Sequence, residues 1–268
     1  MAPRRTQRWP EGWFENDDTV SFEPTVAGRI GNWWFDRVFE PYRLSPRALA
    51  ESLVDGIDGR NHVRFLSFDR RGGRVSVELS GHLGTARIYY GGHTLTVETQ
   101  GRHAEVDLVT VEEPFRGMGV GARLMANLYG VAKAIQADRI GLRAGLEDGP
   151  FVWIKFGFFP TDEQWEKVKK PIRTKLDGLG LMVCREARNR VEQALLSTSG
   201  RAIAIIAAEP DLVMSRPAFS GEPREVALGQ ALLADSGIRW YGEFVFADDE
   251  ARELFEACVE RNIAREPR

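Results

Sequence analysis

Residues 106–121 read VDLVTVEEPFRGMGVG, and this stretch decides how the chain folds. The apolar run 106–111 predicts a strand, and the glycines between Gly117 and Gly121 predict a tight turn. A helix is expected next, at about 119–136, because apolar residues recur there at helical spacing. Glycines at such a junction let several backbone N–H groups converge on one anion, and the helix dipole strengthens the field. The sequence therefore predicts a site for a phosphate or a pyrophosphate.

The composition is that of an ordinary globular protein of 268 residues with a net charge of −3. That charge is too small to indicate a polyanion or a membrane as the partner. The cysteines are Cys184 and Cys258, which stand at no metal or redox spacing, so we expect reduced thiols, a cytoplasmic location and no metal. The basic start, residues 1–5, lacks a following apolar region, and no apolar run is long enough to span a bilayer.

Upstream of the glycine turn, apolar and polar residues alternate with a period of two. The alternation predicts strands, which we place at 63–68, 74–79, 86–90, 94–98 and 103–111. Glycine-rich turns are expected at 71–73 and 91–92, so the strands form an antiparallel meander.

Three segments are expected along the chain. Residues 1–60 are an aromatic-rich arm that either packs on the core or covers a substrate cleft, and it ends with a short helix that begins at Ser45 and Pro46. Residues 61–170 form the core, and 171–268 form a mainly helical extension that includes a helix at about 224–235.

Several phosphate-binding loops compete for the glycine turn. A Walker loop needs Lys-Ser or Lys-Thr after its last glycine, and Ala122-Arg123 stands there instead. The letters Gly117-x-Gly119-x-x-Ala122 fit the dinucleotide-binding turn, which would make the protein an oxidoreductase. However, residues 112–116 separate the strand from the turn, and that fold needs parallel strands where hairpins are expected.

The turn also resembles the acetyl-CoA loop of the GNAT superfamily of N-acetyltransferases, which reads Arg/Gln-x-x-Gly-x-Gly/Ala. Here Arg116-x-x-Gly119-x-Gly121 matches, and a second family motif is matched by residues 153–158, WIKFGF. The order of hairpins, glycine turn, helix, strand, short helix and Gly-Phe also agrees over about 60–160. The resemblance implies an α+β fold with a mostly antiparallel twisted sheet, splayed central strands and flanking helices.

The resemblance also implies where acetyl-CoA would bind. Its pyrophosphate would lie on the backbone amides of the loop, and its pantetheine arm would run beside the end of the strand before it. The positions implied to contact acetyl-CoA are Val109, Thr110, Val111, Arg116, Gly117, Met118, Gly119, Val120, Gly121, Ala122 and Trp153.

Acetyl transfer to an amine needs a group that accepts the amine's proton. His103, Glu105 and Asp107 alternate along one strand and so are expected on one face, with Ala104, Val106 and Leu108 on the other. Ala104-Glu105 resembles the Ala-Glu that carries the base in the histone-acetylating branch of the family. We therefore expect Glu105 to be the general base, with Asp107 and His103 as alternatives, unless a β-bulge changes which side chains face the ligand.

The general acid is less easily assigned. Trp153 stands where many family members have a Tyr that protonates the thiolate, and Leu146 stands where an Asn often contacts pantetheine. Tyr129 or a Tyr of the meander would then serve, or the thiolate leaves unassisted, or catalysis has been lost.

The resulting hypothesis is an acetyl-CoA-dependent N-acetyltransferase that acts on a primary amine in a ternary complex. The acceptor would be a small amine, a protein amine or an aminoacyl-tRNA, and the main alternative is a CoA-binding module without catalysis.

Overall fold

The computed structural model describes residues 9–23, 29–57, 61–71, 73–98, 101–145, 149–216, 222–234 and 236–263. The chain divides into two compact units, one formed by 1–140 with 259–268 and the other by 141–258. The three segments expected from the sequence, 1–60, 61–170 and 171–268, stay a prediction. The basic start at 1–5, Gly72 of the expected turn and Leu146 lie outside the described residues.

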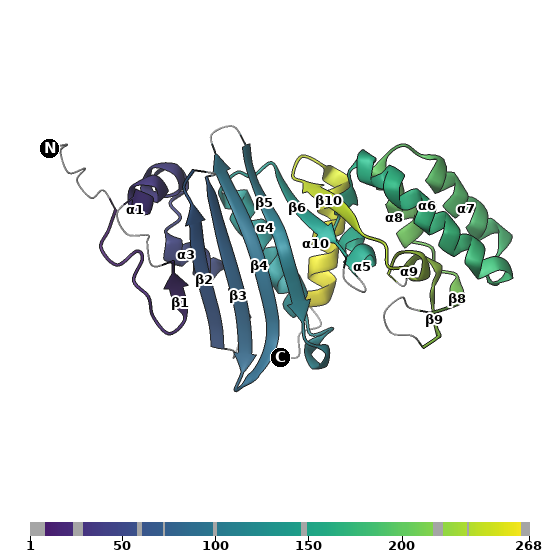
Figure 1. Cartoon of the computed structure of the whole chain (residues 1–268), viewed down its shortest axis with the longest axis horizontal. Coiled ribbons are helices and arrows are strands. Elements are labelled where there is room, and N and C mark those ends of the chain that lie inside the picture. Colours follow the sequence, from purple (N-terminus) through teal and green to yellow (C-terminus); the bar gives the residue numbers. More distant parts are fainter. Residues whose placement is uncertain are drawn as a thin grey trace. The chain divides into compact units, whose positions relative to one another are not determined.

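The first unit is built on a twisted sheet whose strands follow one another in chain order. Its strands are β1 Val20–Phe22, β2 Asn61–Asp69, β3 Arg74–Leu83, β4 Ala86–Glu98 and β5 Gly101–Val111. β1 runs parallel to β2, and every later pair is antiparallel (Figure 1). The expected α+β class with a mostly antiparallel sheet is confirmed.

Helices cover one face of this sheet. The helical elements of the first unit are α1 Arg29–Trp34, the π-helical turn η1 Phe35–Phe39, α2 Glu40–Tyr42, α3 Pro46–Ser52, the 3-10 turn η2 Glu113–Phe115 and α4 Val120–Ala134. α3 begins as expected, because the Ser45 side chain accepts a hydrogen bond from the Ala48 amide at 3.1 Å. Figure 1 shows α3 and α4 together behind the sheet.

The core of the first unit lies between α4 and the face of the sheet that it covers. On α4, Leu124 and Leu128 are fully buried. Alternate residues of the strands are buried too, namely Val75, Val77 and Leu79 on β3, Leu95 and Val97 on β4, and Ala104 and Val106 on β5. We call this the apolar face. The residues between them form the polar face, which carries the side chains that the site uses.

The N-terminal aromatic residues pack on the apolar face. The Trp34 ring meets the Phe68 ring of β2 edge-on with centroids 5.7 Å apart, and Phe14 meets the same ring at 5.7 Å. Trp34 is buried, and its indole N–H donates to the Leu44 carbonyl at 2.8 Å. Of the two roles expected for the arm, these contacts are those of core packing.

One expected turn is wrong. Gly91 and Gly92 were expected to join two strands, but β4 runs unbroken through them from Ala86 to Glu98. Both glycines pair with β3 and β5, and Gly92 lies at an irregularity of the β4–β5 register. Glycine is tolerated within a strand where a bulge or a close approach occurs, so the pair marks a bulge and not a hairpin.

The second unit is mixed. Its elements are the end of β6 Arg139–Ala144, α5 Gly149–Lys155, β7 Phe159–Pro160, α6 Asp162–Leu179, η3 Gly180–Met182, α7 Arg185–Leu196, η4 Gly200–Ala202, α8 Ile203–Ala207, β8 Leu212–Ser215, β9 Arg224–Ala227, α9 Leu228–Leu233, β10 Trp240–Val245 and most of α10 Asp249–Ile263. β10 pairs antiparallel with β7, and β8 pairs with β9. The helix expected at 224–235 is therefore wrong over its first residues, because Arg224–Ala227 pair with β8 before the helix starts.

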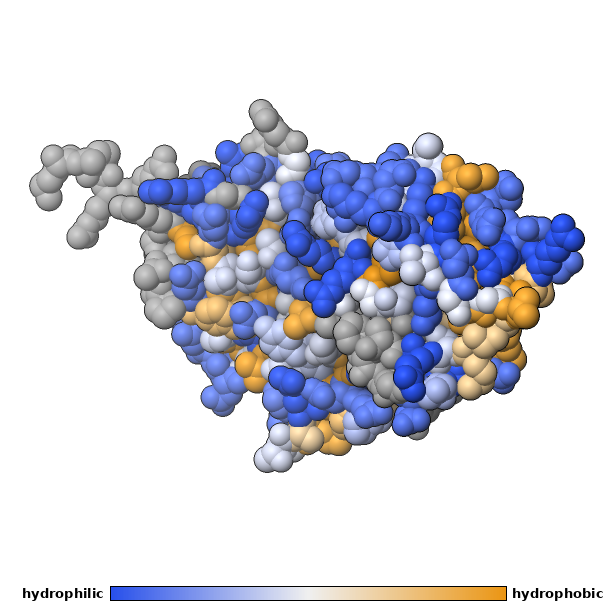
Figure 2. Space-filling view, turned by 45° about the vertical axis from the view of Figure 1, so that its right-hand side comes forward, coloured by the Kyte–Doolittle hydropathy of each residue, from blue (hydrophilic) through white to orange (hydrophobic). Residues whose placement is uncertain are grey.

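The surface seen in Figure 2 is mainly hydrophilic, with smaller hydrophobic patches between. Some large apolar side chains of the second unit are exposed, among them Leu181 and Leu212. Within the described part of the chain, no helix combines the length and the apolar character that crossing a membrane requires.

Candidate functional site

The glycine turn forms the start of α4. After η2, Gly117 and Gly119 both adopt a φ of 79°, a left-handed conformation that side chains beyond glycine rarely adopt. Gly119 is the N-cap of α4, and no side chain caps the helix at that end. A Cβ on Gly117 would meet no atom of the described residues within 4 Å, so they leave this side of the turn open. The amides of the turn and of the first helical turn are thus arranged to receive an anion.

Contacts with the sheet hold this turn in place. The Arg116 Nε donates to the Val111 carbonyl at 3.1 Å, and the Glu112 amide donates to the Ile88 carbonyl at 2.9 Å. Val120 and Ala122 of α4 are buried, while Met118 and Gly121 are half-buried. The loop therefore has a buried side, which anchors it, and an open side, which presents its amides.

The strand before the turn ends in three half-buried residues. Val109, Thr110 and Val111 pair with Gly91, Tyr90 and Tyr89 of β4, in that order. They lead directly into η2 and the glycine turn, so the implied pantetheine and pyrophosphate positions are continuous along the chain.

The structure places His103, Glu105 and Asp107 on the polar face of β5. The His103 Nε2 lies 3.9 Å from the Glu105 Oε1, and the Thr94 hydroxyl of β4 donates to the Asp107 Oδ2 at 2.9 Å. Ala104 and Val106, between them, are buried on the apolar face. The three titratable residues thus form a row, which we call the β5 row. The Glu105 side chain is 43% exposed, so a substrate can reach it.

A β-bulge ends this regular alternation. Gly92 of β4 is paired with Leu108 and His93 with Val106, which leaves Asp107 as the extra residue of β5. Leu108 was expected on the face opposite the β5 row, and this is wrong. Leu108 lies opposite Gly92, which itself lies opposite Glu78 on the polar face. The inserted residue shifts the alternation by one, so Leu108 and Thr110 follow Asp107 on the polar face.

Tyr90 lies on the polar face as well. It pairs with Thr110 of β5, two positions beyond Leu108, and it is hydrogen-bonded to Glu78. Burial raises the pKa of its phenol, and the negative charge of Glu78 adds to the effect, so the group stays protonated at neutral pH. The neighbouring Tyr89 is buried on the other face, where its hydroxyl lies 2.8 Å from the His62 Nδ1. Tyr90 is thus the tyrosine of the meander that shares a face with Glu105.

Trp153 lies in the second unit, on α5. Its ring lies 6.0 Å from that of Phe156 and 5.8 Å from that of Phe158, measured between centroids. It is half-buried, so it serves at least as a packing residue of that unit.

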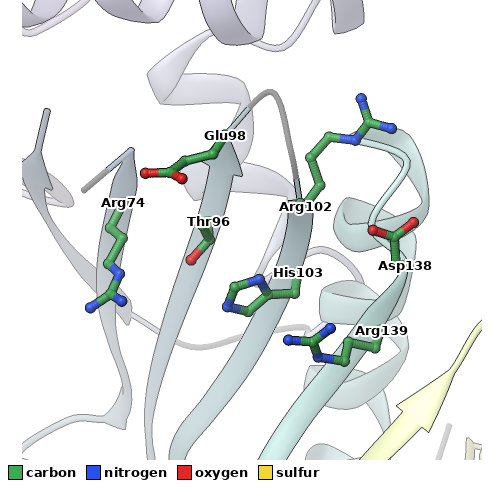
Figure 3. Close-up of a pocket in the computed structure, with 8 residues that line it drawn as sticks. Arg74, Thr96, Glu98, Arg102, His103, Asp138 and Arg139 are labelled. Atoms are coloured by element: carbon green, nitrogen blue, oxygen red, sulfur yellow. The ribbon is translucent and has the colours of Figure 1, made fainter. Parts of the chain in front are cut away.

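The N-terminal end of β5 borders a cavity of about 350 Å³. Its lining residues come from β3, β4, β5 and the start of β6, and they are shown in Figure 3: Arg74, Thr96, Glu98, Gly101, Arg102, His103, Asp138 and Arg139. His103 both lines this cavity and belongs to the β5 row. The cavity could not be predicted from the sequence, because Arg74, Thr96 and Arg139 are far apart in the chain and meet His103 only through strand pairing.

The arrangement argues against the alternative loops. The strands from β2 to β5, which lead to the glycine turn, are antiparallel, whereas a dinucleotide-binding turn belongs to parallel βαβ units. Among the described residues, no three side chains of His, Cys, Asp or Glu lie together in a way that would hold a metal ion.

The comparisons with known proteins agree with the geometry. Residues 33–148, which include the meander, the glycine turn and α4, match the model of the acetyltransferase (GNAT) family. No curated protein sequence matches the chain significantly.

Proposed function

We propose that this protein transfers an acetyl group from acetyl-CoA to a primary amine, because residues 33–148 match the acetyltransferase (GNAT) family. The observation that carries the proposal is that one strand, β5, joins the β5 row to the open glycine turn. The transfer takes place by direct attack in a ternary complex, since the row offers groups that handle protons but the strand offers no cysteine or serine as a nucleophile.

Acetyl-CoA would bind along the second half of β5. Its pyrophosphate lies on the amides from Gly117 to Ala122, where two left-handed glycines and the N-terminal end of α4 support an anion. Its pantetheine arm follows Val109, Thr110 and Val111. The thioester then reaches the bulge at Asp107 and Leu108, next to Glu105.

The β5 row supplies the base. As the amine nitrogen bonds to the thioester carbonyl carbon, it loses a proton to Glu105, directly or through a water molecule. The C–S bond then breaks, and the electron pair leaves with the CoA sulfur. The Asp107 carboxylate already accepts a hydrogen bond from the Thr94 hydroxyl, so we favour Glu105 as the acceptor of the proton.

Tyr90 is the group that we propose as the general acid. It lies on the same face as Glu105, and its raised pKa keeps the phenol protonated until the thiolate forms. This assignment removes the difficulty posed by Trp153, whose indole cannot supply a proton at neutral pH.

Binding and transfer are tested separately. Isothermal titration should show acetyl-CoA binding, and thiol release should follow when a library of amines is added. Glu105→Gln should lower kcat by about a hundredfold or more and leave the Kd for CoA unchanged. Glu51→Gln, an equal change on the exposed side of α3, is the matched control. Absence of CoA binding would refute the proposal.

A CoA-binding module without catalysis is the second candidate, because Trp153 replaces the tyrosine common in the family. Tight CoA binding combined with no thiol release for any amine would favour it. A cytoplasmic location stays a prediction that rests on the small number of cysteines, Cys184 and Cys258, and on their spacing.

A further inference from the structure

The cavity at the N-terminal end of β5 has no role in the reaction described so far. It is bordered by His103, and the Glu105 carboxylate lies only 3.9 Å from that imidazole. A volume of about 350 Å³ is at the small end of what ligand sites have. The cavity is therefore a small compartment directly beside the proposed base.

Hydrogen-bond donors line the inner part of the cavity. Thr96 is 6% exposed, and His103 and Arg139 are half-buried. In Figure 3 the Arg139 guanidinium points toward the His103 ring, and Thr96 lies on the other side of that ring. Arg74 of β3 lies opposite Thr96 in the strand register and adds a second guanidinium from that side. The Arg139 guanidinium is half-buried and that of Arg74 is exposed, so two groups able to form paired hydrogen bonds with an oxyanion border the cavity beside Thr96 and His103.

The acidic residues of the cavity stand at its rim. Glu98 and Asp138 are both exposed, and Glu98 leans over Gly73, where an added Cβ would lie 2.5 Å from the Glu98 Cγ. Arg102 is turned away from the cavity (Figure 3), because it donates to the Tyr42 hydroxyl at 2.8 Å and to the Gln136 carbonyl at 3.0 Å. The less exposed part of the cavity, with Thr96, His103 and Arg139, thus offers hydrogen-bond donors to an anion, whereas the exposed rim carries Arg74 together with the two carboxylates.

We propose that this cavity binds a compact oxyanion, a carboxylate or a phosphate, that belongs to the amine acceptor. The inference rests on the proposed function, since it names the class of substrate for that same site. Guanidinium groups bind both oxyanions through paired hydrogen bonds, with Thr96 and His103 as additional donors. Arg74, Thr96, His103 and Arg139 are then the residues that determine which acceptors are accepted.

The spacing limits the acceptor further. The backbone positions of His103 and Glu105 are about 7 Å apart along β5, and their side chains approach to 3.9 Å between Nε2 and Oε1. An acceptor with its oxyanion at His103 therefore places its amine near Glu105 if a short chain separates the two groups. The exposed charges at the entrance are one guanidinium, that of Arg74, and two carboxylates, those of Glu98 and Asp138, so the entrance does not attract a polyanion. The geometry points to a small zwitterionic amine and not to a tRNA-bound one.

Paired acceptors test the inference. Acetylation of phosphoethanolamine is compared with that of ethanolamine, and acetylation of γ-aminobutyrate with that of butylamine. We expect kcat/KM to be at least about tenfold higher for the anionic member of one pair or both, and the pair that shows it identifies phosphate or carboxylate as the group. Equal kcat/KM values within both pairs would overturn the inference.

Variants assign the effect to the cavity. Arg139→Gln and Arg74→Gln should each reduce the advantage of the anionic acceptor about tenfold and leave the neutral acceptor unaffected. Arg70→Gln, which removes the same charge from the neighbouring β2–β3 turn outside the cavity, is the matched control and should change nothing. An advantage that persists in Arg139→Gln and in Arg74→Gln would also refute the inference.

Failure of the inference is separable from failure of the proposed function. If acetyl-CoA does not bind, the proposed function fails. If CoA binds but no amine is acetylated, titration of the CoA-saturated protein with inorganic phosphate and with acetate still tests the cavity. Binding that is lost in Arg139→Gln supports the inference, and binding that is absent or unchanged in that variant refutes it.

Discussion

His93 is expected to make the stability of the first unit depend strongly on pH. It lies on β4 between Val77 of β3 and Val106 of β5, on the apolar face, and it is fully buried. Neither ring nitrogen has a hydrogen-bond partner within the described part of the chain. Burial among apolar residues lowers the pKa of His93 from 6.5 to about 4, because the charged imidazolium would lose its hydration there.

The size of the effect follows from that shift. A folded-state pKa below the unfolded-state pKa means that the unfolded chain binds the proton more tightly. Stability is therefore fully present above pH 6.5 and falls as the pH drops toward 4. The total loss is about 3 kcal/mol, since each pKa unit corresponds to about 1.4 kcal/mol. At pH 5, about 2 kcal/mol is already lost.

Urea unfolding followed by circular dichroism at about pH 7.5 and pH 5 measures this loss. In His93→Leu, an apolar side chain of similar size replaces the unpaired imidazole, and the difference between the two pH values should shrink by about 2 kcal/mol. His82→Leu is the matched control, because His82 is half-buried and lies 3.1 Å from the Ser80 hydroxyl. If His93→Leu keeps the pH dependence of the natural protein, the reasoning is wrong.

Three further substitutions test the loop and the packing. Gly119→Ala should weaken CoA binding about tenfold in a titration and cost about 1 kcal/mol of stability, because its φ of 79° disfavours a side chain; unchanged affinity would contradict the anion role of the turn. Trp34→Ala should cost about 3–5 kcal/mol in urea unfolding, since it empties a buried site against Phe68, and a loss below about 1 kcal/mol would place the arm outside the core. Gly157→Ala should lower the free energy of unfolding of the second unit by about 3 kcal/mol, because the new Cβ would lie 2.3 Å from the Ala251 carbonyl oxygen. An unfolding free energy equal to that of the natural protein would show that α10 shifts to make room for the Cβ.

Features that depend on neighbouring residues were predictable from the sequence. The glycine turn and α4 could be placed because glycine conformation and helical periodicity are both local. Ser45 was correctly placed as a helix cap for the same reason. The alternation along β5 likewise placed His103, Glu105 and Asp107 on one face.

Features that depend on a partner strand were not predictable. Gly91-Gly92 has the same letters as a hairpin turn, and only its pairing with β3 and β5 shows that it lies inside β4. The face of Leu108 depended on the same pairing, because the extra residue of the bulge is defined by what stands opposite it. The periodicity of a sequence describes each strand by itself. These two wrong predictions therefore both lie at the β4–β5 bulge, where one strand has an extra residue relative to its partner.

The proposed site has one half set by consecutive residues and one half set by residues from several strands. The half of β5 that leads into the glycine turn is defined by local sequence, and it is the half that we propose binds acetyl-CoA. The other half is completed by Arg74 and Arg139, which stand on β3 and β6, and it is the half that we propose binds the acceptor. A binding element made of consecutive residues leaves a motif, whereas a pocket made of distant residues can change its specificity without altering that motif. Candidate acceptors should therefore be chosen by their fit to the cavity, and Arg139 is the first residue to substitute.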